Sequence, residues 1–127
     1  MTVNDPQTVA EVTAMFERYE AALMDNDTDA LTAMFWNSPL TLRYGVGEIL
    51  YGYEAIAAFR ANRKGGAPKR SLGKTCITTF GTDHAVANTE FQRENTDRLG
   101  RQSQTWVRFA EGWRIVSAHV SLQGDAS

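Results

Sequence analysis

A tyrosine and an arginine are two residues whose side chains could do chemistry if they faced a buried site. Tyr19 lies in FERYEAAL and Arg43 in LTLRYGVGE. A phenol is protonated at neutral pH, so a buried Tyr19 hydroxyl would act first as a proton donor. The guanidinium of Arg43 could clamp a carboxylate through parallel hydrogen bonds. Each residue also has a purely structural interpretation, Tyr19 as an aromatic core residue and Arg43 as a solvent-facing strand residue.

Five residues on predicted strands are weaker candidates for binding a substrate: Glu90, Gln92, Trp106, His119 and Ser121. Alternation along a strand puts His119 and Ser121 on one face of their strand. It likewise puts Glu90 and Gln92 on one face of another strand. If these faces line a pocket, their side chains would orient substrate or hold water. The structural alternative makes His119 a core residue and lets Trp106 pack the sheet or a subunit contact.

A basic stretch without an intervening acid lies between Glu54 and Asp83. Its members are Arg60, Arg63, Lys64, Lys69, Arg70 and Lys74. Such a run is usually solvated surface, although it could draw anionic substrates toward a pocket. Nucleic acid is not an expected partner, because no recognition motif accompanies the run and the net charge is −2.

Several familiar active-site chemistries have no counterpart in the sequence. His84, His119 and Cys76 show no zinc-ligand spacing, so no metal site is expected. There is no GxSxG motif, and Gly65-Gly66 lacks the remaining residues of a phosphate-binding loop. A cofactor-free enzyme or a binding protein remains.

Composition predicts one domain over residues 1–127. The length of 127 residues favours a single core, and a hydrophobic fraction of 43% is ordinary for a globular protein. One cysteine fits a reducing compartment. The start of the chain lacks a signal sequence, and no run is long enough to span a membrane. We therefore expect a cytoplasmic protein without a membrane partner.

Apolar spacing predicts three helices in the first half of the chain. The first begins at the Asp5-Pro6 cap. Its apolar stripe consists of Val9, Val12, Phe16, Tyr19 and Leu23. Asp27 caps a shorter helix that ends at Ser38-Pro39, and a third helix spans roughly Tyr53 to Lys64 before Gly65-Gly66.

Strands account for most of the remainder. Two short strands, Leu40–Tyr44 and Glu48–Tyr51, form a small hairpin between the second and third helices. Long strands follow at about Arg70–Phe80 and His84–Arg93. The segment from Gln102 to Leu122 then forms a hairpin with its turn at Ala110-Glu111-Gly112.

This element order predicts an α+β domain in which three N-terminal helices pack on a strongly curved antiparallel sheet. Such a sheet, bent over a long helix, encloses a conical pocket. Neither face of the last strand is wholly polar, so the face without helices should also be covered. We therefore expect a homodimer.

Four segments carry a resemblance to a known family: PLTLRYGVGE, YGYEAIAAFR, TFGTDHAVANTEF and GRQSQTWVRFAEGWRIVSAHVSL. They resemble the AtzH-like family, which includes the oxalurate-catabolism HpxZ-like proteins. The likeness runs from about Thr8 to Leu122. That family belongs to the nuclear-transport-factor-2-like, or SnoaL-like, superfamily, so the resemblance implies a cystatin-like cone.

The resemblance also implies a function. It suggests catabolism of small nitrogen-rich acids beside an amidase-signature hydrolase. For the AtzH branch, the implied reaction converts 1,3-dicarboxyurea, a small dianionic ureide, to allophanate during cyanuric acid degradation. The family's functional pair, a tyrosine on the first helix and an arginine on the first strand, matches Tyr19 and Arg43. Arg43 would anchor a carboxylate while Tyr19 protonates the departing nitrogen.

Two other functions fit the same fold. The chain could be a non-catalytic binding module or accessory partner of an amidase-signature hydrolase. It could also be an isomerase or dehydratase of the cone type. That chemistry would need an ionisable base facing the substrate, and His119 or Glu90 could serve as that base.

Overall fold

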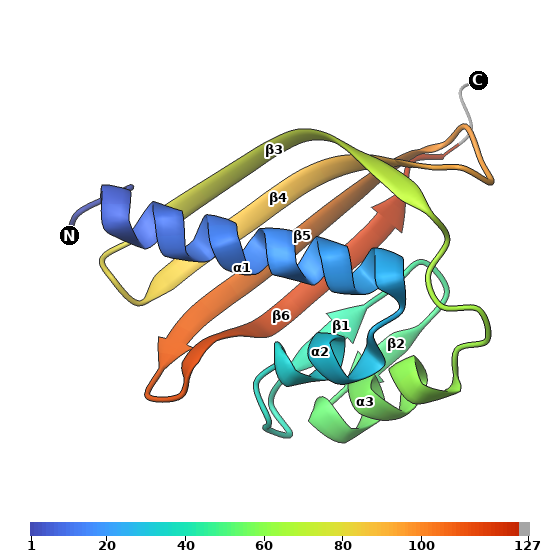
Figure 1. Ribbon diagram of the computed structural model, residues 1–127, viewed down its shortest axis with the longest axis horizontal. Coiled ribbons are helices and arrows are strands. Elements are labelled where there is room, and N and C mark those ends of the chain that lie inside the picture. The colour runs from blue at the N-terminus through green and yellow to red at the C-terminus, as the bar shows by residue number, and fades with distance from the viewer. Residues whose placement is uncertain (125–127) are drawn as a thin grey trace.

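Three helices and six strands make up the computed structural model, which describes residues 1–124 (Figure 1). In chain order they are α1 (Pro6–Asp25), α2 (Thr28–Ala33), β1 (Leu42–Tyr44), β2 (Ile49–Tyr51), α3 (Tyr53–Asn62), β3 (Arg70–Phe80), β4 (His84–Arg93), β5 (Leu99–Phe109) and β6 (Gly112–Leu122). The order is the predicted one, with a small hairpin between α2 and α3 and four long strands at the end.

Helix α1 begins on the residues that the sequence singles out. The Asp5 carboxylate accepts hydrogen bonds from the Thr8 backbone N–H (3.1 Å) and hydroxyl (2.9 Å), and Pro6 starts the helix. Asn26, in the left-handed conformation at φ 53°, ends it. The predicted stripe is buried from Val12 to Leu23 and half-buried at Val9. Within residues 1–124, no helix combines the length and apolar character needed to cross a membrane.

All six strands join in one sheet, in the order β2-β1-β6-β5-β4-β3. The four long strands pair antiparallel, but β1 runs parallel to β6, with Arg43 beside Ala118. The sheet is therefore mixed, and the expectation of an antiparallel sheet is wrong at this pair. A strand as short as β1 carries no sequence signal for its neighbour or direction, which the helical packing decides. The strong curvature that we expected is not confirmed.

The helices all lie on one face of the sheet. Figure 1 shows α1 crossing the long strands, with α2 and α3 beside β1 and β2 at one end. The core between these layers is built on Trp106 and Ile115, both 0% exposed, with Phe35 and Ile56 packed against them. Helices on one face of a sheet give the predicted α+β architecture.

Glycine at position 100 lets an aromatic side chain lie flat on the sheet. Gly100 on β5 pairs with Phe91 on β4, and a Cβ at Gly100 would overlap the Phe91 ring. Phe91 is 1% exposed, so its ring has no room to withdraw. The same ring supports the guanidinium groups of Arg70 (4.4 Å to the ring centroid) and Arg93 (5.7 Å).

Gly100→Ala should lower the free energy of unfolding by about 1–3 kcal/mol, because the added methyl overpacks a filled site. Urea unfolding measures this change. Gly73→Ala is the matched control, since it is also a strand glycine but its Cβ would make only ordinary contacts with Glu90. An equal effect of both substitutions would contradict the packing argument.

Candidate functional site

One cavity lies between the C-terminal half of α1, helix α3 and the sheet. Tyr19 and Arg43 both line it, so the structure brings the two main candidates together. Five arginines contribute to its wall: Arg43, Arg60, Arg63, Arg70 and Arg93. Its volume of about 10 Å³ is room for roughly one water molecule. A larger ligand can enter only if side chains of the wall turn aside.

Tyr19 reaches the cavity from the buried stripe of α1. Its side chain is 3% exposed, and its ring meets Phe35 edge to face at 6.3 Å. Arg60 Nη2 donates a hydrogen bond to the Tyr19 hydroxyl oxygen at 2.7 Å. A guanidinium has donors and no acceptor, so the tyrosine oxygen accepts this bond and keeps its own proton for another partner.

Arg43 reaches the same cavity from β1. Its neighbours Leu42 and Tyr44 are half-buried, whereas Arg43 is 4% exposed and points toward the helices. Its Nη1 donates to Glu48 Oε1 at 2.6 Å, across the turn between β1 and β2. A Cβ at Gly45 would overlap that carboxylate, so glycine at this position permits the pair.

The arginines of the wall have too few counter-charges. Arg70 donates from Nε (3.0 Å) and Nη2 (2.6 Å) to the two Glu20 carboxylate oxygens. Arg60, Arg63 and Arg93 have no carboxylate partner among residues 1–124. Burial is the main cause that lowers the pKa of these three arginines, and repulsion from neighbouring arginines adds to it.

The face of the sheet without helices carries four of the other candidates. Gln92 and His119 are exposed there, with Glu90 and Ser121 half-buried. His119 packs edge-on against Tyr44, with 5.5 Å between ring centroids, and Ser121 accepts a hydrogen bond from Arg101. Along β4 and β6 the side chains that point toward the helices are those of the alternate residues, such as Phe91 and Val120. The structure therefore does not bring these four residues to the cavity of Tyr19 and Arg43.

Trp106, the remaining candidate, lies on the helix side of the sheet but in the core. It is 0% exposed, and its indole N–H donates to Gln104 Oε1 at 3.1 Å. It is not among the residues that line the arginine cavity. Its position matches the structural alternative, in which it packs the sheet.

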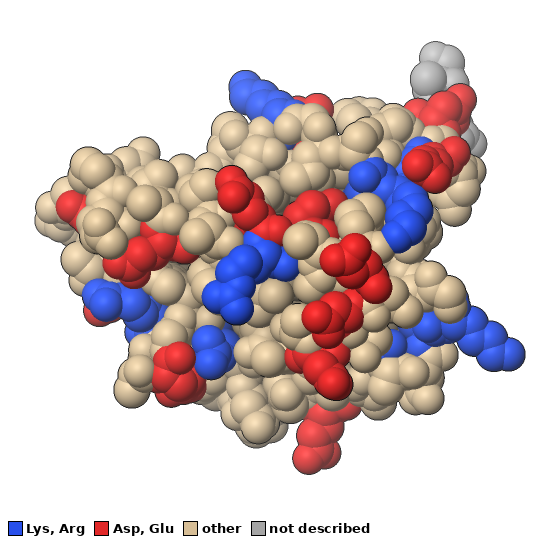
Figure 2. Space-filling model, in the orientation of Figure 1, with Lys and Arg blue, Asp and Glu red and all other residues tan. Residues whose placement is uncertain are grey.

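Sequence reasoning missed four of the five arginines as cavity residues. The stretch that we interpreted as solvated surface is divided: Arg60 is 3% exposed and lines the cavity, whereas Lys69 and Lys74 stay in solvent. Figure 2 shows charges of both signs interspersed on the face it displays. The signal was present in the spacing, because Arg60 follows the inward Ile56 by four residues and therefore shares its helix face.

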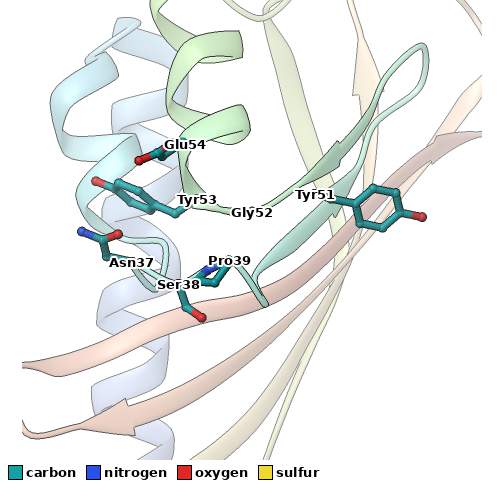
Figure 3. A pocket seen from close by; sticks show the side chains of 7 residues that line it. All are labelled: Asn37, Ser38, Pro39, Tyr51, Gly52, Tyr53 and Glu54. Atoms are coloured by element: carbon teal, nitrogen blue, oxygen red, sulfur yellow. The ribbon is translucent and has the colours of Figure 1, made fainter.

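A larger surface groove lies beside the start of α3 (Figure 3). Its volume is about 390 Å³, and its lining includes Asn37, Tyr53 and Glu54. Figure 3 shows Tyr51 pointing away from these three side chains. The lining holds one carboxylate and no cation, so the groove lacks the opposed groups that the arginine cavity combines.

Solved structures similar to this chain share its fold. A protein of unknown function from Pectobacterium atrosepticum, described as a DUF3225 family member, is 53% identical (TM-score 0.93; 96% of this chain and 95% of that chain covered). A cystatin-like fold protein from Burkholderia xenovorans is 50% identical (TM-score 0.94; 99% of both). A nuclear transport factor 2-like protein from Salmonella enterica is 26% identical (TM-score 0.76; 95% and 94%).

These similarities confirm the cystatin-like fold expected from the sequence. No curated protein matches the chain. The family model described as AtzH-like matches residues 1–126. Because this match covers nearly the whole sequence, the chain belongs to the AtzH-like family.

Proposed function

We propose that this protein is a cofactor-free enzyme that removes one terminal carboxyl group from a small N-carboxylated urea, converting 1,3-dicarboxyurea to allophanate in cyanuric acid degradation. The observation that carries the proposal is the meeting of Tyr19 and Arg43 in one buried, arginine-lined cavity. Membership of the AtzH-like family supports it. A dianion suits this cavity, since taking carboxylates out of water costs several kcal/mol unless cations replace the water.

Arg43 is the anchor in this mechanism. Its planar fork suits a carboxylate, and it now holds Glu48 at 2.6 Å. A substrate carboxylate would exchange with Glu48, whose side chain is 21% exposed and can turn toward solvent. Arg63, which has no carboxylate partner among the described residues, can move aside to admit the ligand.

Tyr19 supplies the proton. The bond between the terminal carboxyl carbon and its nitrogen breaks, the nitrogen takes the Tyr19 proton, and the carbon leaves as carbon dioxide. If water adds to that carbon, the same proton transfer releases carbonic acid, which loses one proton to become bicarbonate. Arg60, which donates to the Tyr19 oxygen at 2.7 Å, stabilises the phenolate until solvent reprotonates it. Positioning and charge stabilisation carry the rate, without a covalent intermediate.

The alternative isomerase or dehydratase chemistry needs an ionisable base that faces the substrate, and the candidates for it were His119 and Glu90. Both residues lie on the face of the sheet without helices, so the arginine cavity receives no base from them. Turnover of 1,3-dicarboxyurea by the purified protein distinguishes an enzyme from a non-catalytic partner of an amidase-signature hydrolase.

We also propose that the protein is a homodimer, with the helix-free face of the sheet as its subunit interface. Val86, Thr105 and Val107 are half-buried there, between residues that point to the core. A second copy would complete the burial of these side chains. We expect sedimentation equilibrium to give twice the chain mass of 14.1 kDa, and Val86→Glu to shift the protein toward one chain mass. A wild-type protein that sediments as one chain would contradict this proposal.

Tyr19→Phe should lower kcat for 1,3-dicarboxyurea by about 10²–10⁴-fold, because a positioned proton donor contributes that much. Tyr53→Phe is the matched control, since Tyr53 lies in the other groove. Release of carbon dioxide or bicarbonate and of allophanate measures both. Full activity in a folded Tyr19→Phe protein would contradict the role of Tyr19 as the proton donor.

Arg43→Ala should lower kcat/KM for 1,3-dicarboxyurea by about 10–150-fold, because the substrate carboxylate loses its charge-assisted hydrogen bonds to the guanidinium. Arg108→Ala is the control, because Arg108 pairs with Asp83 on the surface, where the side chains are 42% and 53% exposed. A wild-type protein that turns over dicarboxyurea only after an amidase is added would instead support the accessory-partner alternative.

The ion pair between Arg43 and Glu48 should make stability depend on acid pH. Partial burial raises the pKa of Glu48, but the hydrogen bond and charge of Arg43 outweigh it, so the net pKa is lowered. A lowered pKa stabilises the fold above the unfolded-state pKa of about 4.3, and the contribution disappears as pH falls through the folded-state pKa.

We therefore expect Glu48→Gln to be less stable than wild type at pH 7 and the gap to close on acidification below about pH 4. Urea unfolding at several pH values measures it. Glu17→Gln, at an exposed position of α1, is the control and should show no such closing gap. A gap of constant size would mean that the Glu48 charge does not stabilise the fold.

A further inference from the structure

We propose that the arginine cavity contains two separate carboxylate subsites, one built on Arg43 and the other on Arg93 with Gln102, and that this pair of subsites selects small dianions over monoanions. The inference rests on the proposed function, since it concerns the same cavity, and it assigns the second carboxylate of the substrate to residues that the proposed mechanism does not use.

Unpaired donors mark the cavity as incomplete. Five buried side-chain polar atoms lack a hydrogen-bond partner within residues 1–124, and four of them belong to residues of this wall. They are Arg43 Nε, Arg60 Nε, Arg93 Nε and Gln102 Nε2. Buried donors are normally satisfied, and here all four unsatisfied atoms are N–H groups that an anionic oxygen would accept from.

Charge gives an independent reason for an anion of more than one charge. Five arginines line the wall, and within residues 1–124 Glu20 and Glu48 each neutralise one of them, which leaves three positive charges there. One carboxylate would compensate only one of these charges. A dianion compensates two, so less unpaired charge stays out of water.

Four of the five arginines form two groups, each on its own aromatic ring. Arg43 and Arg63 lie 5.5 Å and 5.3 Å from the centroid of Phe59. Arg70 and Arg93 lie 4.4 Å and 5.7 Å from the centroid of Phe91. The two groups start from different parts of the sheet, since β6 and β5 separate β1, which carries Arg43, from β4, which carries Arg93.

The group on Phe91, which consists of Arg70 and Arg93, lies beside N–H donors that have no acceptor among the described residues. Arg70 is committed to Glu20, and its Nη2 also donates to Gln102 Oε1 at 3.0 Å. That contact turns the Gln102 amide so that its Nε2 remains unpaired, and Arg93 has no carboxylate among the described residues. Arg93 and the Gln102 amide therefore offer N–H groups to the far carboxylate while Arg43 holds the near one.

This arrangement also favours product release. The reaction removes one carboxylate, so allophanate can fill only one of the two subsites. The product then binds more weakly than the substrate without any change in the protein. The same difference discriminates against monocarboxylates that are present in the cell.

The test compares two stable ligands by calorimetry: glutarate, which has the chain length of dicarboxyurea, and butyrate, which lacks one carboxylate. Wild type should bind glutarate at least about 10-fold more tightly than butyrate. Arg93→Met keeps the apolar stem on Phe91 but removes the charge, and it should abolish this preference while butyrate binding stays unchanged. Arg101→Met, on the helix-free face, should alter neither affinity.

Equal binding of both ligands by wild type would overturn the inference, and so would an equal loss of both in Arg93→Met. Arg93→Lys, which retains the charge but not the fork, serves if the methionine variant does not fold, and it should lose part of the preference. The outcomes separate from those of the proposed function. Selectivity for glutarate without turnover of dicarboxyurea would support the two subsites and contradict the proposed enzyme activity. Turnover of dicarboxyurea with an unchanged KM in Arg93→Met would support the enzyme activity and contradict the second subsite.

Discussion

Burial of positive charge is the constraint on which the rest of this structure depends. Arg43 and Arg60 are almost completely removed from water, and Arg63 and Arg93 partly so. Guanidinium groups do not give up their protons in proteins, so this charge cannot be relieved by titration. It must be met by carboxylates, aromatic rings or a ligand, and the residues that the structure describes supply carboxylates for only two of the five arginines.

The fold supplies the rings and the enclosure. Phe59 from α3 and Phe91 from β4 each hold two guanidinium groups, and Gly100 leaves the space that Phe91 occupies. Helix α1 covers the cavity with Tyr19, whose hydroxyl satisfies one donor of Arg60. An apolar core thus supports a polar chamber in which, within residues 1–124, four side-chain N–H groups lack an acceptor.

Local patterns were enough to predict most of the elements. The Asp5-Pro6 cap, the apolar stripe of α1 and the Ala110–Gly112 turn are short-range signals, and the structure has a helix or a turn at each. Pairing across the sheet is not local. The parallel contact of β1 with β6 joins segments far apart in the chain, and nothing in the three residues of β1 specifies it.

The sequence by itself determined the helices, the long strands, the family resemblance and the candidacy of Tyr19 and Arg43. Only the tertiary structure decided which polar residues share a chamber. A strand pattern separates residues into two faces but does not say which face the helices cover, so His119 and Glu90 could not be excluded beforehand. Arg60 was grouped with surface charges and Arg93 was not singled out. Spacing could place Arg60 on the helix face of Ile56, but burial of a charged side chain also depends on distant segments closing over it.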